Sequence, residues 1–271
     1  MSGMSEHVQI VSCSTFHDPD FSLKEDLKSA LPLIKSIFHK STVCITPSSN
    51  EEIMDMLKEN DIEIAVGPKM ERLGTYKKSM ELGRDLIKDE KKQRLFYVDF
   101  DRLVHWANFH PLELSNLKNK INKCDYLHVG RTGRAFATHP ETQIKTERIV
   151  NELSSKVMGM KETVDVISVC YFLTKDLAAA LITQTMITDM GFYGAWPVLL
   201  WNWSSEQKKA YIEAEGLEWE TPDRFKRQIE KIGHEKWVQQ FKTPSEWKFR
   251  VKLMHECMTE LMNISNLTLK K

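Results

Sequence analysis

Two aspartates, Asp99 and Asp101, are separated by one residue and follow the apolar run at residues 95–98. If they continue an extended strand, their side chains point to the same face and that of Phe100 points to the other. Carboxylate oxygens are the ligands that Mg²⁺ and Mn²⁺ prefer, and a cation held there can stabilise a diphosphate leaving group. The pair therefore predicts a site for Mn²⁺ or Mg²⁺. The alternative is that one aspartate caps a turn and the other is solvated.

The segments before the pair alternate between strand-like and helical patterns. Apolar, β-branched runs predict strands at residues 8–13, 42–46, 62–66 and 95–98, and helical spacing predicts helices at 23–39, 51–59 and 73–89. This order favours an α/β fold with a Rossmann-like, mostly parallel sheet and helices on both faces. Because ligands bind at the carboxyl ends of such strands, the acidic pair should share one edge with residues 14–16, 46–48 and 67–69.

The second half of the chain is less regular. Strands are expected at residues 126–129 and 164–172, together with a helix capped by Thr138 and running to about Val157, and a helix capped by Thr174 and running through Ile187. From Ser204 the pattern predicts only helices, and two of them begin with Ser or Thr followed three residues later by Glu or Gln, at Ser204 and Thr243. We therefore expect one sheet domain over residues 1–203 and a C-terminal helical extension over residues 204–271 that packs on it.

Composition excludes several classes of protein. Among 271 residues, Lys and Arg number 38 and Asp and Glu number 38, so the basic excess of a nucleic-acid-binding protein is missing. No stretch approaches the roughly 20 apolar residues of a membrane span, and residues 1–9 lack the apolar core of a signal peptide. We expect a cytoplasmic protein that binds no nucleic acid and has no transmembrane segment.

Cysteine and histidine spacing gives no recognisable metal motif. The five cysteines are scattered without a CxxC pair, which argues against a zinc site. His105, His110, His128 and His139 are separated by 5, 18 and 11 residues, and these spacings match no standard ligand pattern. Most are expected to be structural or surface histidines, and His105 and Trp106, just beyond the acidic pair, are the two residues of most interest.

The order of elements, together with the D-x-D at the end of the fourth strand, resembles the nucleotide-binding half of A-type-fold glycosyltransferases over residues 8–203. The resemblance implies a nucleoside-diphosphate sugar donor and a Mn²⁺ or Mg²⁺ ion held by Asp99 and Asp101. It also implies that the end of the first strand lies against the nucleotide and that a glycine followed by basic residues precedes the D-x-D strand. On this basis the nucleotide-sugar residues are Ser14, Thr15, Phe16, Lys69, Gly74, Lys77, Asp99 and Asp101.

A second candidate loop is GRTGR at residues 130–134. Its two arginines can grip a carboxylate or phosphate in a bidentate manner, and a plain surface turn is the alternative. The aromatic cluster at residues 192–203 offers faces on which a sugar ring stacks, although core packing is the more common role. The acceptor, which the sequence does not identify, is expected to meet Arg131, Arg134, His139 and Trp196.

A catalytic base is harder to find. Inverting members of the family present an acidic residue near the acceptor, but residues 191–195 contain none, and the nearest carboxylate is Asp189. Either Asp189 serves as the base, or the reaction retains configuration without one, or catalysis is lost.

These observations predict a metal-dependent glycosyltransferase of the hexosyltransferase type. A sugar-phosphate nucleotidyltransferase has a similar sheet, but residues 14–19 lack the glycine and basic residues that such enzymes place after the first strand. A catalytically degenerate module that only binds a nucleotide sugar is the non-enzyme alternative. The donor's base and sugar, the stereochemistry and the oligomeric state are left undetermined.

Overall fold

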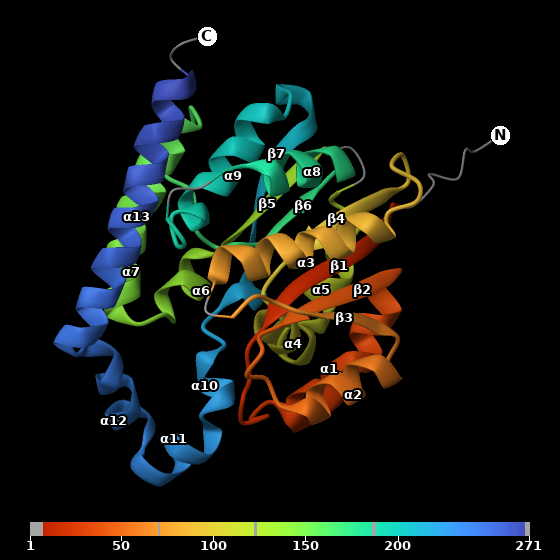
Figure 1. Ribbon diagram of the computed structural model, residues 1–271. Helices are drawn as coiled ribbons and strands as arrows, with labels where there is room; N and C mark the ends of the chain where they lie inside the picture. The colour runs from red at the N-terminus through yellow and green to blue at the C-terminus, as the bar shows by residue number, and fades with distance from the viewer. Residues whose placement is uncertain (1–7, 70, 122–123, 186–187, 269–271) are drawn as a thin grey trace.

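A seven-stranded sheet forms the centre of the molecule, and its strands run in the order β3-β2-β1-β4-β6-β5-β7 (Figure 1). The computed structural model describes residues 8–69, 71–121, 124–185 and 188–268. All neighbouring strands pair in parallel except β6, which runs antiparallel to both β4 and β5. The strands are β1 (Gln9–Phe16), β2 (Lys40–Ile45), β3 (Ile62–Val66), β4 (Gln93–Tyr97), β5 (Tyr126–Arg131), β6 (Tyr171–Leu173) and β7 (Lys209–Ala214).

Strand β1 is central among the N-terminal strands and sets the position of the candidate site. It pairs with β2 so that Phe16 lies opposite Ile45, and with β4 so that Cys13 lies opposite Tyr97. The carboxyl ends of β1, β2 and β4 therefore meet at one edge of the sheet. The acidic pair directly follows β4 at that edge.

One face of the sheet is covered by α1 (Lys24–Ile37), α2 (Glu51–Glu59), α4 (Phe100–Phe109) and α5 (Pro111–Leu117). Their apolar side chains form one buried core with the strands, and α1 packs on α4. A residue next to α2 shows how local sequence sets the start of a helix. The side chain of Asn50 caps α2 by accepting the N–H of Glu52 at 2.8 Å.

The opposite face is covered by α3 (Arg72–Leu86), α8 (Lys175–Thr183) and α9 (Phe192–Trp203), which share a second core with the sheet. The longest helix, α13 (Pro244–Thr268), lies along α7 (Glu141–Val157) and also packs on α9 (Figure 1). The fold class predicted from the sequence, a mostly parallel α/β sheet with helices on both faces and a C-terminal helical part, is confirmed.

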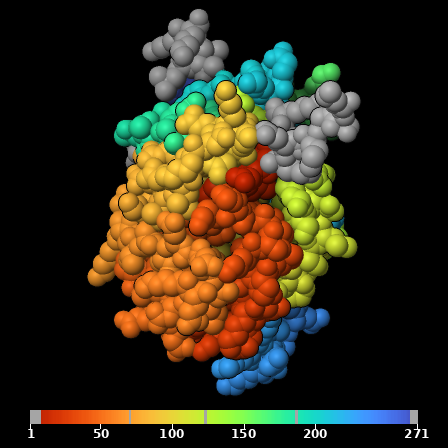
Figure 2. Space-filling view, turned by 90° about the vertical axis from the view of Figure 1, so that its right-hand side faces the viewer, coloured from red at the N-terminus to blue at the C-terminus, as the bar shows by residue number. Residues whose placement is uncertain are grey.

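Short helices connect these layers. They are α6 (Gly133–Ala137), α10 (Thr221–Arg224), α11 (Lys226–Ile232) and α12 (His234–Gln239), with the 3-10 turns η1 (Glu206–Lys208), η2 (Glu215–Leu217) and η3 (Gln240–Lys242). Most of the side seen in Figure 2 belongs to the N-terminal half, coloured red to yellow. Within the residues that the structure describes, no helix combines the length and apolar character needed to cross a bilayer.

Three sequence expectations need correction. Residues 209–214 are not helical; they form β7, which pairs with β5, so the sheet continues beyond residue 203. Only Tyr171–Leu173 of the expected strand at 164–172 pairs with other strands. The two helices after the acidic pair, α4 and α5, were not predicted. Backbone pairing with a distant partner decides the first two cases, and neither the edge strand β7 nor the three-residue strand β6 carries much local signal for it.

Candidate functional site

A cavity of about 790 Å³ opens at the carboxyl edge of β1, β2 and β4. Its walls come from the ends of β1 and β2, from the segment that opens α3, and from the start of α4. The side chains that line it are Thr15, Phe16, His17, Thr46, Pro47, Ser48, Pro68, Lys69, Glu71, Arg72, Thr75, Tyr76, Asp99, Asp101, Asp189, Tyr193 and Arg224. The volume is in the range of sites that hold small organic ligands.

Asp99 occupies the N-cap position of α4, with φ −60° and ψ 139°. One of its oxygens, Oδ1, accepts hydrogen bonds from the hydroxyls of Thr15 at 3.0 Å, Tyr76 at 2.9 Å and Tyr97 at 3.1 Å. These bonds come from β1, α3 and β4, so three elements hold the carboxylate in place. Its other oxygen, Oδ2, receives no hydrogen bond from the residues described.

Asp101 lies in the first turn of α4, where its Oδ1 accepts the N–H of Arg102 at 3.0 Å. The pair therefore does not continue a strand, as the sequence interpretation assumed, because the helix already begins at Phe100. Phe100 turns into the core, where its ring meets Phe16 edge-on at 5.2 Å between centroids. Both aspartates nevertheless line the same cavity.

Charged groups from the C-terminal part lie against Asp101. Burial and the neighbouring charges of Glu220 and Asp99 raise the pKa of Asp101 to about 7. Glu220 pairs with Arg102 at 3.5 Å, and its Oε2 is buried without a hydrogen bond. The Nε of Arg224 is also buried without one, although this residue lines the cavity. Asp99, Asp101 and Glu220 thus bring three carboxyl groups close together, beside the guanidinium groups of Arg102 and Arg224.

The acidic pair fits a divalent cation. Each aspartate has one oxygen engaged in hydrogen bonds within the protein, and both side chains face one cavity. The donor set contains only oxygen, which suits Mg²⁺ or Mn²⁺ better than a softer ion. A cation would also offset the burial and the carboxylate repulsion that together raise the pKa of Asp101.

The residues predicted for the nucleotide sugar divide into two groups. Thr15, Phe16 and Lys69 line the cavity beside the acidic pair. The other three do not. Ser14 is buried in β1, and Gly74 packs against Pro68 and Glu71. The ammonium of Lys77 donates to the carbonyl oxygen of Gln184, which directs this side chain toward the end of α8.

Asp189, the predicted base, also lines the cavity. Its Oδ1 accepts the N–H of Leu73 at 2.8 Å and its Oδ2 accepts the N–H of Arg72 at 3.3 Å. Both N–H groups belong to the first turn of α3. The N-cap residue of this helix, Glu71, makes no capping hydrogen bond with its own side chain. Asp189 thus caps the N-terminus of α3, and both of its carboxylate oxygens are engaged in that contact.

The acceptor residues predicted from the sequence do not line the cavity. The Arg131 side chain is buried and donates to Asp165 at 2.7 and 2.8 Å and to Glu147 at 2.6 Å. Trp196 is completely buried and His139 is 4% exposed. Such side chains have no surface for an acceptor, so the geometry gives Arg131, Trp196 and His139 structural roles. Arg134 is half exposed and pairs with Glu215 and Glu218.

Sequence reasoning missed several lining residues. The hydroxyl of Tyr193 donates a 3.3 Å hydrogen bond to the hydroxyl of Tyr76, which in turn donates to Oδ1 of Asp99. Arg72 and Arg224 bring positive charge to a cavity whose centre is acidic. Arg224 lies more than a hundred residues from the acidic pair in a segment without a motif, so only the folded structure reveals it.

Comparison with known proteins identifies the fold. No family model matches the sequence, and no curated protein matches it. Solved structures of glucosyl-3-phosphoglycerate synthase from Mycobacterium tuberculosis do match. The complex with Mn²⁺, uridine diphosphate and phosphoglyceric acid is 12% identical with a TM-score of 0.51, covering 76% of this chain and 68% of that one. The complex with phosphoglyceric acid alone is 10% identical with a TM-score of 0.53, covering 76% and 70%.

The chain therefore has the A-type fold of nucleotide-sugar glycosyltransferases, as the sequence resemblance implied. A further complex of the same synthase holds Mn²⁺, uridine-diphosphate-glucose and phosphoglyceric acid, at 11% identity and a TM-score of 0.51 over 76% of this chain and 69% of that one. At such identities the likeness concerns the fold alone.

Proposed function

We propose that this protein is a glycosyltransferase that uses a nucleoside-diphosphate sugar and a divalent cation held by Asp99 and Asp101. The observation that carries the proposal is the position of both aspartates in one large cavity, at the carboxyl edge of the sheet of an A-type fold. Mn²⁺-bound and uridine-diphosphate-bound structures of the similar synthase support this choice of ligands.

The lining of the cavity offers groups that suit both parts of such a donor. The ends of β1 and β2 supply Thr15, Phe16 and Pro47, a wall of aromatic, apolar and hydroxyl groups for a nucleoside. Lys69 and Arg224 supply positive charge for the diphosphate. The bound cation would neutralise the diphosphate as it leaves.

The protein's own contribution is positioning. Thr15, Tyr76 and Tyr97 direct hydrogen atoms at Oδ1 of Asp99, which leaves Oδ2 for the cation. Groups that orient a metal-binding carboxylate tune its affinity for the ion. The hydroxyls of Tyr76 and Tyr97 stay protonated because burial and the charge of Asp99 raise the pKa of both groups well above the usual value.

A thermal-shift screen tests donor binding. The full chain is heated with UDP, GDP, ADP or CDP, each with and without Mn²⁺. A nucleotide at 100 times its dissociation constant stabilises the folded state by about 2.7 kcal/mol, which is roughly 5–10 °C in Tm for a chain of this size. We expect one nucleotide to give such a shift only when Mn²⁺ is present.

Matched variants locate the binding. Asp101→Asn removes one charge from the cavity and should abolish the Mn²⁺-dependent shift. Asp55→Asn removes one charge from the exposed surface of α2 and should leave the shift unchanged. A shift that survives in Asp101→Asn, or a screen in which no nucleotide binds with Mn²⁺, refutes the proposed donor site.

Turnover separates an enzyme from a binding module. An active transferase slowly hydrolyses its nucleotide sugar when no acceptor is present, and released UDP or GDP can be measured directly. Mn²⁺-dependent binding without any release, with a panel of sugar and phosphorylated acceptors, would identify the degenerate binding module instead.

A further inference from the structure

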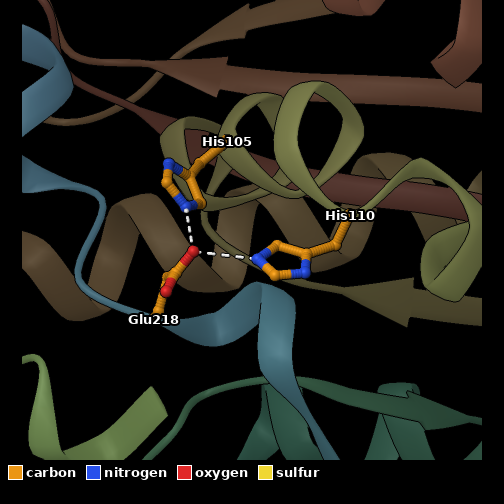
Figure 3. Close-up of side chains that lie close together, drawn as sticks. All are labelled: His105, His110 and Glu218. Atoms are coloured by element: carbon orange, nitrogen blue, oxygen red, sulfur yellow. Dashed lines mark hydrogen bonds and ion pairs between the residues drawn. The ribbon is translucent and has the colours of Figure 1, made fainter. Parts of the chain in front are cut away.

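A second cluster of metal-binding side chains lies away from the cavity, between α4 and the segment after β7. His105 in α4, His110 at its end and Glu218 after η2 each offer one ligand atom, and these atoms lie within 4.8 Å of one another (Figure 3). Oε1 of Glu218 is 3.3 Å from Nε2 of His105 and 2.8 Å from Nε2 of His110. The sequence spacing of the histidines gave no hint of this cluster, because its third member is more than a hundred residues away.

The backbone around the cluster is fixed by other contacts. Glu113 in α5 accepts the N–H groups of Glu215 and Gly216 at 2.9 Å and the indole N–H of Trp106 at 2.8 Å. At Gly216 the chain passes so close to α4 that a Cβ atom there would be 1.9 Å from Cδ1 of Trp106. The turn that presents Glu218 is therefore held against α4 without help from the histidines.

The surroundings orient the ligand atoms. Nδ1 of His105 is 2.6 Å from Oδ2 of Asp223, so Asp223 can accept a hydrogen bond from Nδ1. That bond leaves the Nε2 lone pair free toward Glu218 and His110, an arrangement common behind metal-bound histidines. Arg134 holds the other oxygen of Glu218, Oε2, at 2.6 Å. The side chains of His105, His110 and Glu218 are 9%, 25% and 19% exposed, so the cluster is sheltered but can be reached by an ion.

We propose that His105, His110 and Glu218 bind a Zn²⁺-class transition-metal ion at a site separate from Asp99 and Asp101. Two imidazole nitrogens and one carboxylate oxygen form a donor set that zinc accepts, and a water molecule would complete four ligands. The acidic pair offers only oxygen and suits a harder ion. Glu215, Glu218 and Asp223 against Arg134 also give the site an excess of negative charge.

The hydrogen bonds between Glu218 and the two histidines require particular protons on the imidazole rings. If both histidines donate from Nε2 to Glu218, His105 must carry protons on both ring nitrogens, since Nδ1 also faces a carboxylate. An ion bound between the three side chains replaces the two Nε2 protons, which are released on binding.

Such an ion would connect the C-terminal segment to the cavity. It joins α4 to the segment that carries Glu218 and Asp223. The same segment presents Glu220 and Arg224 to the acidic pair. A zinc ion would therefore fix the segment that carries Glu220 and Arg224 beside the acidic pair, without entering the cavity.

Competition with a coloured chelator tests the site. The full chain is stripped of metal, given excess Mn²⁺ to fill oxygen-only sites, and titrated with Zn²⁺ in the presence of the chelator. We expect one equivalent of zinc to be retained. His110→Ala should weaken retention at least about tenfold, and Asp223→Asn should weaken it roughly 10–100-fold, as loss of an orienting group does.

Two controls assign the ion. His255→Ala removes an exposed histidine of α13 and should retain zinc like the natural sequence. Asp101→Asn should also retain it, although the same variant loses Mn²⁺-dependent nucleotide binding if the proposed function is right. Zinc retention that is lost in Asp101→Asn but kept in His110→Ala would overturn the proposal, as would no retention by the natural sequence. Failure here leaves the donor-site test unaffected.

A spectroscopic measurement removes the dependence on variants that fold. X-ray absorption at the zinc edge of the loaded natural protein should show the scattering pattern of two imidazole rings. A spectrum with oxygen ligands alone would place the ion elsewhere and overturn the proposal.

Discussion

The two arginines of the GRTGR loop provide a sharp test of the structure, because the fold gives them opposite environments. Arg131 has a fully buried side chain between Asp165 and Glu147, whereas the side chain of Arg134 is 53% exposed. We predict that Arg131→Leu, at the end of β5, strongly destabilises the protein and that Arg134→Leu, three residues later in α6, does not.

The size of the effect follows from what Arg131→Leu leaves behind. Asp165 and Glu147 stay buried, with side chains 8% and 7% exposed, and lose their main cation. Burial alone would raise the pKa of Asp165, but the charge and hydrogen bonds of Arg131 lower this pKa to about 2. Relative to an ordinary aspartate near 3.9, that difference corresponds to about 2.5 kcal/mol. Breaking a buried pair by removing one partner usually costs about 3–5 kcal/mol, and we expect Arg131→Leu to fall in this range.

Urea unfolding followed by tryptophan fluorescence measures the difference. Arg134→Leu should lower the free energy of unfolding by less than about 1 kcal/mol, as is typical of exposed ion pairs. The reasoning is refuted if Arg131→Leu is within about 1 kcal/mol of the natural sequence. A normal free energy of unfolding combined with a raised acceptor KM would instead restore the acceptor role that the sequence suggested.

Three further changes probe other parts of the molecule. Burial lowers the pKa of His128 to about 4 in the folded protein, compared with about 6.5 in the unfolded chain. Between these pH values the unfolded chain binds more protons, so the stability of the folded protein falls as the pH drops from about 6.5 to about 4. Over that range the natural protein should lose about 3 kcal/mol more than His128→Gln, as measured by urea unfolding at each pH, and parallel curves would contradict this. Tyr76→Phe removes a hydrogen bond to Asp99 and should weaken Mn²⁺ binding roughly 10-fold or more in a calorimetric titration, so an unchanged affinity would exclude this orienting role. Gly216→Ala drives a methyl group into Trp106 and should cost about 1–3 kcal/mol, seen as a lower Tm; an unchanged Tm would show that the turn can move aside.

The sequence was most informative where structure depends on neighbours along the chain. Apolar, β-branched runs and helical spacing predicted the strand and helix order through residue 98 because each buried strand is apolar within a few residues. The same order placed the acidic pair at the carboxyl edge of the sheet, which is where the cavity opens. It did not reveal that a helix starts at Phe100, since the run of apolar residues continues past the end of β4.

Contacts between distant segments decided the rest. β7 is a strand because its backbone pairs with β5, and Arg131 is buried because Asp165, 34 residues away, encloses it. His105 meets Glu218 across 113 residues. Pairing and burial of this kind depend on which surfaces the fold brings together, and no local pattern records that. The sequence by itself therefore determined the fold class and the edge where chemistry is expected. The tertiary structure alone decided which charged side chains face the cavity, which are buried for stability, and which form a second candidate metal site.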